Sequence, residues 1–255
     1  SAVAGTLTDG ESIRKLAADV DVLTVEIEHI DTTSLATIEA EGRVAVHPSP
    51  RTLATIQDKY LQKMHMSSVP GVVLGDYADA PDAAAVAAAG EKWGYPLMLK
   101  ARTLAYDGRG NAVVKSAADV TTAFASLSNN GNVALYVERW CEFTAELAVM
   151  VVRARDGTTL SYPVVRTEQR DSQCHTVVVP SGIPPQMVQA AQDVAKAAVG
   201  SLWGAGIFGV ELFAMANGSV LLNEIAPRPH NSGHYTMDAC VTEQHEMHLR
   251  AVAGL

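Results

Sequence analysis

The sequence predicts a mixed fold of the α+β and α/β classes, with a short β-α-β unit ahead of a larger region of sheets covered by helices. Residues 21–31 alternate apolar and polar side chains with the period of a β-strand. A Pro-Ser-Pro sequence at 48–50 marks a joint, because the residue before a proline disfavours helix. Strand patterns then dominate after residue 96. We therefore expect one domain at 1–50 and another at 51–255.

The first domain is expected to contain one strand, one helix and a second strand. Its first strand alternates three apolar side chains with three polar ones: Leu23, Val25 and Ile27 against Thr24, Glu26 and Glu28. Asp31, Thr32 or Thr33 can cap the following helix at 34–42, and residues 44–48 form the next strand.

The second domain is expected to begin with a helix at 51–66, a short strand at 71–75 and an Ala-rich helix that ends at Gly94. Seven strands follow, at 97–100, 111–115, 134–138, 146–153, 160–165, 207–213 and 219–224. Helices are expected at 116–127 and 185–204. Strands and helices mixed in this way favour sheets that are covered on one face.

The charge, cysteine content and hydropathy exclude several classes of partner. Net charge is −9 over 255 residues and the basic residues are scattered, so a nucleic acid is not expected as a partner. No run approaches the roughly 20 apolar residues of a membrane span. Three widely spaced cysteines argue against a disulfide framework or a cysteine-based zinc site and favour a reducing compartment.

Two glutamates are expected to face each other across a hairpin. Asn217-Gly218 lies between two apolar strands, and Asn-Gly favours a two-residue turn. With that turn Glu211 lies opposite Glu224, and facing carboxylates repel each other unless a cation or a shared proton compensates. Magnesium prefers oxygen ligands and phosphates, so it fits this pair, with Asn223 as an amide ligand and Arg228 as a phosphate clamp. Two solvated glutamates on an exposed hairpin face are the alternative.

A second candidate for phosphate binding is the segment that follows Lys100. The glycines in "AYDGRGN", Gly108 and Gly110, would let the backbone approach phosphate oxygens. The segment matches neither of the usual phosphate-loop fingerprints, and Asp-Gly is also an ordinary hairpin turn.

A third cluster is "LYVERWCEFTAEL", in which Glu138 ends one strand and Glu146 begins the next. An adenosine needs an acceptor for its amine and carboxylates for its ribose hydroxyls, while Trp140, Cys141 and Phe143 could wall the base. A polar loop with one aromatic side chain in the core is the alternative.

The order of these segments resembles the ATP-grasp ligases, and among them the carboxyaminoimidazole ribonucleotide synthetase family of purine biosynthesis in its fungal and plant form. The motifs that carry the resemblance span nearly the whole chain: "DVLTVEIEHID", "TIQDKYLQK", "LKARTLAYDGRGN", "YVERW", "AELAVMVVRARDG", "GVELF" and "LLNEIAPRPHNSGHYTMDAC". The last is highly specific. The resemblance implies an ATP-grasp domain at 51–255, divided at 135/136, after part of a pre-ATP-grasp domain.

The resemblance also implies a role for individual residues. Lys59 and Lys100 would bind ATP phosphates under a lid loop at 105–111, and Glu211 and Glu224 would bind magnesium. The full set of expected ATP contacts is Lys59, Lys100, Ala105, Tyr106, Asp107, Gly108, Arg109, Gly110, Asn111, Glu138, Arg139, Trp140, Cys141, Glu146, Gln169, Asn223 and Glu224. The residues expected to face the ribonucleotide and carboxyphosphate are Glu28, Tyr106, Asp107, Arg109, Arg228, His230, Asn231 and Ser232. The expected catalytic residues are Lys100, Arg109, Arg228 and His230.

The implied reaction is ATP- and bicarbonate-dependent carboxylation of the exocyclic amine of aminoimidazole ribonucleotide through carboxyphosphate, with ATP and Mg²⁺ as cofactors. A near-neutral pKa of His230 would suit it to bind carboxyphosphate or to accept the amine proton. Glycinamide ribonucleotide synthetase or formate-dependent transformylase chemistry, and a nucleotide-binding fragment without turnover, remain alternatives. A zinc hydrolase using His230, His234, His245 and His248 is disfavoured, because their spacing is not that of a zinc motif.

Members of this family also carry an N-terminal strand with a glycine-rich G-Q-L-G loop and a small C-terminal domain. Neither is found in this sequence, so the resemblance implies a fragment with a nearly complete ATP-grasp core. A homodimer and a fused mutase domain stay open as partners. The cytoplasm is the expected location, or a plastid for a plant-type source.

Overall fold

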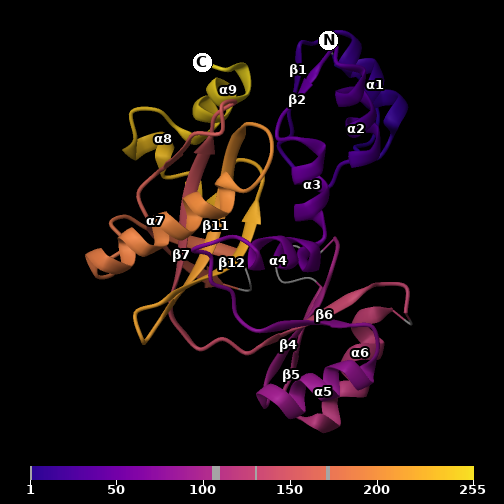
Figure 1. Cartoon of the computed structure of the whole chain (residues 1–255), viewed down its shortest axis with the longest axis vertical. Helices are drawn as coiled ribbons and strands as arrows, with labels where there is room; N and C mark the ends of the chain where they lie inside the picture. The colour runs from indigo at the N-terminus through magenta and orange to yellow at the C-terminus, as the bar shows by residue number, and fades with distance from the viewer. Residues whose placement is uncertain (1, 105–109, 130, 171–172) are drawn as a thin grey trace.

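The computed structural model describes residues 2–104, 110–129, 131–170 and 173–255 of the chain. The chain has three parts in sequence order: an N-terminal unit, a small sheet with its helices, and a larger sheet. Helices α3 and α4 connect the N-terminal unit to the two sheets (Figure 1). The mixed helix and sheet content confirms the predicted fold class.

The N-terminal unit pairs two short parallel strands and packs them against helices. Its elements are α1 (Gly10–Ala18), β1 (Val22–Leu23), α2 (Thr32–Glu41) and β2 (Ala45–Val46). Asp31 caps α2 as predicted, because its carboxylate accepts a hydrogen bond from the backbone N–H of Thr33. The first strand is shorter than predicted. The strand ends at Leu23, so the alternation does not continue; Ile27 is exposed and Glu28 is buried.

The connecting segment forms two helices where the sequence predicts one. They are α3 (Pro50–Gln57) and α4 (Lys59–Ser67), and they meet at Asp58, whose backbone is extended. The Asp58 carboxylate accepts hydrogen bonds from the backbone N–H groups of Tyr60 and Leu61, so Asp58 caps α4 and interrupts the longer helix.

The small sheet has the strand order β3-β6-β4-β5, and all its neighbours are antiparallel. Its elements are β3 (Tyr77–Ala80), α5 (Ala83–Trp93), β4 (Leu97–Ala101), β5 (Asn111–Val114), η1 (Ala117–Asp119), α6 (Val120–Ser128) and β6 (Leu135–Arg139). One face packs on α5 and α6, which confirms the predicted one-sided covering. The alternation along β4 and β6 therefore turns Lys100 and Glu138 to the other face.

Two boundaries differ from prediction in this region. The strand predicted at 71–75 is reduced to a single bridge between Leu74 and Leu222, because this segment packs against the core of the large sheet; β3 follows at Tyr77. Since β6 is paired within the small sheet, that subdomain ends after Arg139 rather than at residue 135.

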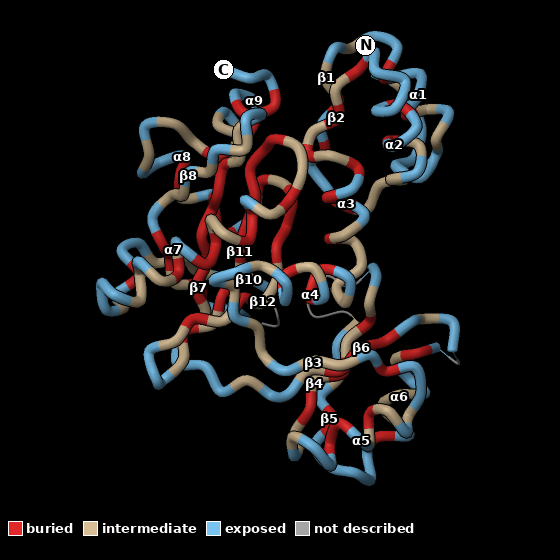
Figure 2. The backbone as a smooth tube through the Cα atoms, viewed as in Figure 1, coloured by how far each residue is buried: buried red, intermediate tan, exposed pale blue. Residues whose placement is uncertain are grey.

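The large sheet has the order β10-β9-β7-β11-β12, with β8 paired to β7. Its strands are β7 (Phe143–Arg153), β8 (Thr159–Ser161), β9 (Val165–Arg170), β10 (Gln173–Val178), β11 (Gly206–Met215) and β12 (Val220–Ala226). One face packs on α7 (Pro185–Gly200) around the main hydrophobic core, visible as the buried strands in Figure 2. At one end the opposite face packs on α9 (Gln244–Ala253), after η2 (Asn231–Gly233) and α8 (Thr236–Ala239). The rest of that face presents polar side chains, as described next.

Candidate functional site

A row of carboxylates lies on the face of the large sheet opposite α7. Val210 and Leu212 of β11 belong to the core on the α7 side, so the intervening Glu211 points to the other face. Glu211 pairs directly with Glu224 of β12, as the sequence predicts. Glu146 of β7 lies on the same face, because it alternates with the buried Leu147. Three acidic groups therefore gather on one side of the sheet.

The hairpin that aligns Glu211 with Glu224 differs from the predicted two-residue turn. The Met215 N–H donates to the Ser219 carbonyl, so the turn contains three residues, the last of which is Gly218 with φ of 86°. Alone, this longer turn would shift the pairing by one residue. A β-bulge after Glu211 leaves Asn223 as an extra residue in β12 and restores the alignment. The predicted pairing is thus correct although the predicted turn is wrong.

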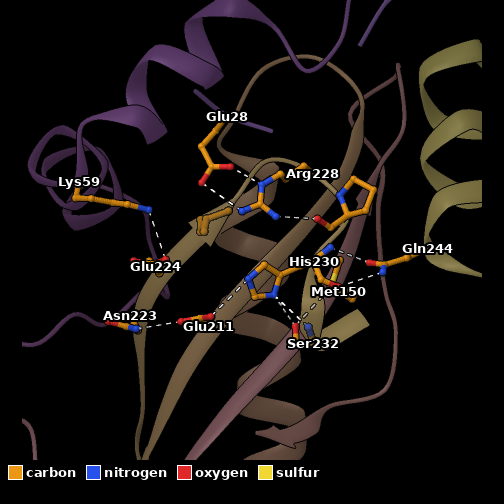
Figure 3. A network of polar contacts seen from close by, with 12 residues as sticks. Glu28, Lys59, Met150, Glu211, Asn223, Glu224, Arg228, His230, Ser232 and Gln244 are labelled. Atoms are coloured by element: carbon orange, nitrogen blue, oxygen red, sulfur yellow. Dashed lines mark hydrogen bonds and ion pairs between the residues drawn. The ribbon is translucent and has the colours of Figure 1, made fainter. Parts of the chain in front are cut away.

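The bulge also turns Asn223 toward the carboxylates. The Asn223 Nδ2 atom donates to Glu211 Oε2 at 3.3 Å (Figure 3). The Asn223 Oδ1 atom is buried and has no hydrogen-bond partner among the described residues. A buried amide oxygen without a partner beside two carboxylates supplies the oxygen ligands that a hard divalent cation prefers. The residues therefore fit magnesium.

No cluster of three or more His, Cys, Asp or Glu side chains with metal-binding geometry occurs in the described parts of the chain. A cation at the hairpin would thus be held by two carboxylates and one amide, with water or phosphate completing its coordination. The same result gives no support to the zinc alternative.

The two facing carboxyl groups have different acidities. Burial and the charge of Glu224 raise the pKa of Glu211 to about 7. Burial also acts on Glu224, but the charges of Lys59 and Lys100 outweigh it and lower the pKa of Glu224 overall. The Lys59 Nζ atom lies 3.5 Å from Glu224 Oε1. Without a metal, one carboxylate is therefore compensated by lysine and the other holds a proton near neutral pH.

His230 lies against the sheet beside Glu211. A Cβ atom at Gly209 would come within 2.6 Å of the His230 Cβ atom, so glycine is needed for this approach. The Ser232 N–H donates to His230 Nδ1, so the neutral ring carries its proton on Nε2, which lies 3.6 Å from Glu211 Oε1. Burial lowers the pKa of His230 to about 4. The expected near-neutral pKa is therefore wrong, and the ring is uncharged at neutral pH.

Arg228 connects the large sheet to the N-terminal unit. Its guanidinium donates to the Glu28 carboxylate through Nε and, at 3.4 Å, through Nη2 (Figure 3). Burial disfavours ionised Glu28, but the Arg228 hydrogen bond and charge lower its pKa overall. Gln57 Nε2 in turn donates to the backbone carbonyls of Glu28 at 2.6 Å and Ile30 at 2.7 Å. Glu28 and Arg228, both predicted to face the ribonucleotide and carboxyphosphate, are thus brought together.

Glu138 has a different environment from the one expected. Its carboxylate lies between two ammonium groups, with Lys63 Nζ at 2.6 Å from Oε1 and Lys100 Nζ at 2.7 Å from Oε2. Burial alone would raise the pKa of Glu138, but the charges of Lys100 and Lys63 lower it to about 2. The Glu138 carboxylate is therefore paired with two lysines, which the sequence analysis did not expect.

The remaining predicted ATP contacts lie in several places. Glu146 accepts a hydrogen bond from Gln169, which acts to lower its pKa. Burial has the larger effect and raises the pKa of Glu146 overall. Trp140 is 39% exposed, and Cys141 Sγ lies 3.6 Å from the Met215 sulfur. Arg139 Nη1 pairs with Asp76 at 3.3 Å.

The structure describes only part of the predicted lid loop at 105–111. Ala105, Tyr106, Asp107, Gly108 and Arg109 lie outside the described residues. Gly110 accepts a backbone hydrogen bond from Ala101, and Asn111 pairs with Lys100 at the start of β5.

Within η2, Asn231 is exposed but Ser232 is 1% exposed. The Ser232 hydroxyl lies 2.8 Å from His230 Nδ1, so this serine supports the histidine ring.

Comparison with known proteins identifies the family. The family model described as the ATP-grasp domain matches residues 65–245. The chain belongs to the ATP-grasp family. A second model, the ribonucleotide synthetase preATP-grasp domain, matches residues 1–57 of this ATP-grasp chain.

Several relatives resemble the ATP-grasp chain over almost its whole length. Phosphoribosylaminoimidazole carboxylase of Schizosaccharomyces pombe is 50% identical over 98% of the chain, which spans 44% of that relative. N5-carboxyaminoimidazole ribonucleotide synthase of Synechococcus elongatus is 36% identical over 99% of the chain and 62% of its own length. The chain thus spans less than half the length of its fungal relatives.

Solved structures agree with this ATP-grasp assignment. The carboxyaminoimidazole ribonucleotide synthase of Aspergillus clavatus complexed with ATP superimposes with a TM-score of 0.91 at 42% identity, over 99% of this chain and 65% of that one. A complex of the synthase from the same organism with ADP and 5-aminoimidazole ribonucleotide gives 0.90 at 40% identity, with the same coverage.

Sequence reasoning missed three residues of the ATP-grasp site. Lys63 could have been found, since it lies one helical turn after Lys59 on the same face of α4. No local sequence pattern identifies Gly209 as a site residue. Gln244 holds both backbone polar groups of His230 through its side-chain amide, a contact between distant segments that no sequence pattern marks.

No described helix is long and apolar enough to cross a membrane.

Proposed function

We propose that this chain is the ATP-grasp part of an N5-carboxyaminoimidazole ribonucleotide synthase. The single observation that carries the proposal is the polar hairpin: Glu211, Glu224 and Asn223 supply oxygen ligands next to lysines, at the junction with the Glu28–Arg228 pair. The relatives named above, two of them bound to ATP or to ADP and aminoimidazole ribonucleotide, support the choice of substrates.

In the proposed reaction a bicarbonate oxygen attacks the γ-phosphorus of ATP and displaces ADP, which gives carboxyphosphate. The exocyclic amine of aminoimidazole ribonucleotide then attacks the carboxyl carbon, releases phosphate and loses a proton. When bound, magnesium neutralises charge on the phosphates. Lys59 and Lys100 orient the same groups, so catalysis of the first step is mainly positioning and electrostatic stabilisation.

His230 and Arg228 would act on the carboxyphosphate and ribonucleotide side of the site. Neutral His230 presents its Nε2–H, so it suits donation to a carboxyphosphate oxygen better than acceptance of the amine proton, because a group with a pKa of about 4 is a weak base. Arg228 would bind anionic oxygens next to it. Glu28, Tyr106, Asp107, Arg109 and Asn231 remain the proposed ribonucleotide contacts.

The further domains of the whole protein and its cellular compartment are also proposals. The fungal relatives are more than twice as long as this chain, which leaves room for a fused mutase domain. We keep the cytosol as the proposed compartment, with a plastid as the alternative because the Vigna aconitifolia relative is described as chloroplastic.

The test is bicarbonate-dependent phosphate release by the full-length protein with aminoimidazole ribonucleotide and ATP. Glu224→Gln removes a proposed magnesium ligand and should lower the rate about a hundredfold or more. The matched control is Glu91→Gln, the same change at an exposed position of α5 away from the site. Near-normal activity of Glu224→Gln would refute the magnesium assignment, and ATP consumption independent of bicarbonate would favour another ligase of the family.

A further inference from the structure

Two lysines share one buried carboxylate at the junction of α4 and the small sheet. The Lys63 side chain is 7% exposed and that of Glu138 is 13% exposed. Lys100 contacts the second oxygen of the same carboxylate. In the described part of the chain no other carboxylate lies within 4 Å of Lys63. This triad therefore carries one positive charge more than Glu138 compensates.

The triad is anchored where it meets the proposed ATP site. Gln62, the neighbour of Lys63, accepts a hydrogen bond from Ile225 N at 3.0 Å and donates to Ile225 O at 3.2 Å, so α4 is fixed to β12. The charges of Glu224 and Glu211 both act to raise the pKa of Lys100, which is raised overall, whereas burial lowers the pKa of Lys63 overall although Glu224 acts on it too. Lys100 is therefore the member of the triad that stands next to the proposed metal and phosphate positions.

An incoming phosphate changes the balance of this triad. Lys100 must donate to phosphate oxygens while it is still the partner of a carboxylate that burial makes costly to leave uncompensated. We propose that Lys63 is a positioning residue, which keeps Glu138 neutralised so that Lys100 is available to the nucleotide. This inference rests on the proposed function, since it assumes that the chain binds ATP.

A double-mutant cycle distinguishes a role of Lys63 through Glu138 from direct contact between Lys63 and ATP. Lys63→Met in the full-length protein should weaken Mg-ATP binding, measured by calorimetry, about tenfold or more, because Lys100 is then held by Glu138 alone. In the Glu138→Gln background there is no charge to neutralise. The same Lys63→Met change should there alter the dissociation constant less than about threefold.

Steady-state kinetics and folding provide the accompanying readouts. Lys63→Met should raise KM for ATP and leave KM for aminoimidazole ribonucleotide unchanged, a separation that general loss of structure would not produce. If Lys63→Met alone melts early, the comparison of Glu138→Gln with Lys63→Met/Glu138→Gln still tests the proposal. Both variants lack the Glu138 charge, so a large loss of ATP affinity between them would assign Lys63 as a direct ligand.

Equal loss of ATP affinity in both backgrounds would overturn the proposal and assign Lys63 as a direct ligand, and so would no loss in either. Failure of the wild-type protein to bind Mg-ATP is a separate result, which would overturn the proposed function and this inference together.

Discussion

Replacing Glu211 by glutamine removes one of two facing carboxylates and keeps the size of the side chain. In the metal-free protein, burial and the charge of Glu224 raise the pKa of Glu211 to about 7 from an ordinary value of 4.5. The folded protein thus holds this proton more tightly than the unfolded chain, so stability is lost as pH rises from about 4.5 through about 7. The full effect would be about 3 kcal/mol. Because the side chain is 30% exposed, we reduce it to roughly 1–2 kcal/mol.

The assay is urea unfolding of wild type and Glu211→Gln, with a metal chelator, near pH 5 and near pH 8. Relative to wild type, Glu211→Gln should gain roughly 1 kcal/mol of unfolding free energy between these conditions. Burial lowers the pKa of both His230 and His248 to about 4, which acts in the opposite direction on both proteins and cancels in the comparison.

Glu142→Gln, at an exposed position, is the matched control and should show no such gain. If the difference between Glu211→Gln and wild type is the same near pH 5 and near pH 8, the electrostatic account of the facing carboxylates is refuted.

Two further predictions concern the surroundings of this pair. Gly209→Ala should lower the unfolding free energy by about 1–3 kcal/mol and reduce activity, because the added methyl displaces His230; denaturation and phosphate release measure both, and unchanged values would contradict the contact. Arg228→Lys should cost about 1–2 kcal/mol, since an ammonium cannot reproduce the two-pronged contact with Glu28. In a Glu28→Gln background the same Arg228→Lys change should cost clearly less, and an equal cost would show that the pair is not coupled.

The parts of the site that lie on regular strands were predictable from sequence. Leu212 and Leu222 mark the buried face, so the opposite orientation of Glu211 follows from alternation alone. The pairing with Glu224 was also predicted, although the turn and the bulge shift the register by one residue each and cancel. Local turn preferences do not report such compensation, because a bulge is fixed by packing on both faces.

The parts that depend on distant contacts were not predictable in this way. Glu28 and Arg228 are 200 positions apart, and only the fold brings them together. The alternation through Ile27 predicted a strand that includes Glu28, whereas the strand ends at Leu23 and Glu28 is buried. The pKa of His230 likewise depends on its burial near Arg228, which no pattern in the sequence contains.

The bulge at Asn223 also determines how β12 responds to changes in length. Before it Leu222 faces α7, and after it Ile225 does, so the inward and outward phase of the strand shifts by one residue at this point. Losing Asn223 would leave an unbroken alternation with Leu222 and Ile225 still buried, whereas losing Leu222 would place Asn223 at the inward position that Leu222 fills. The middle of this buried strand is therefore the place where a one-residue deletion preserves the core and removes only the amide.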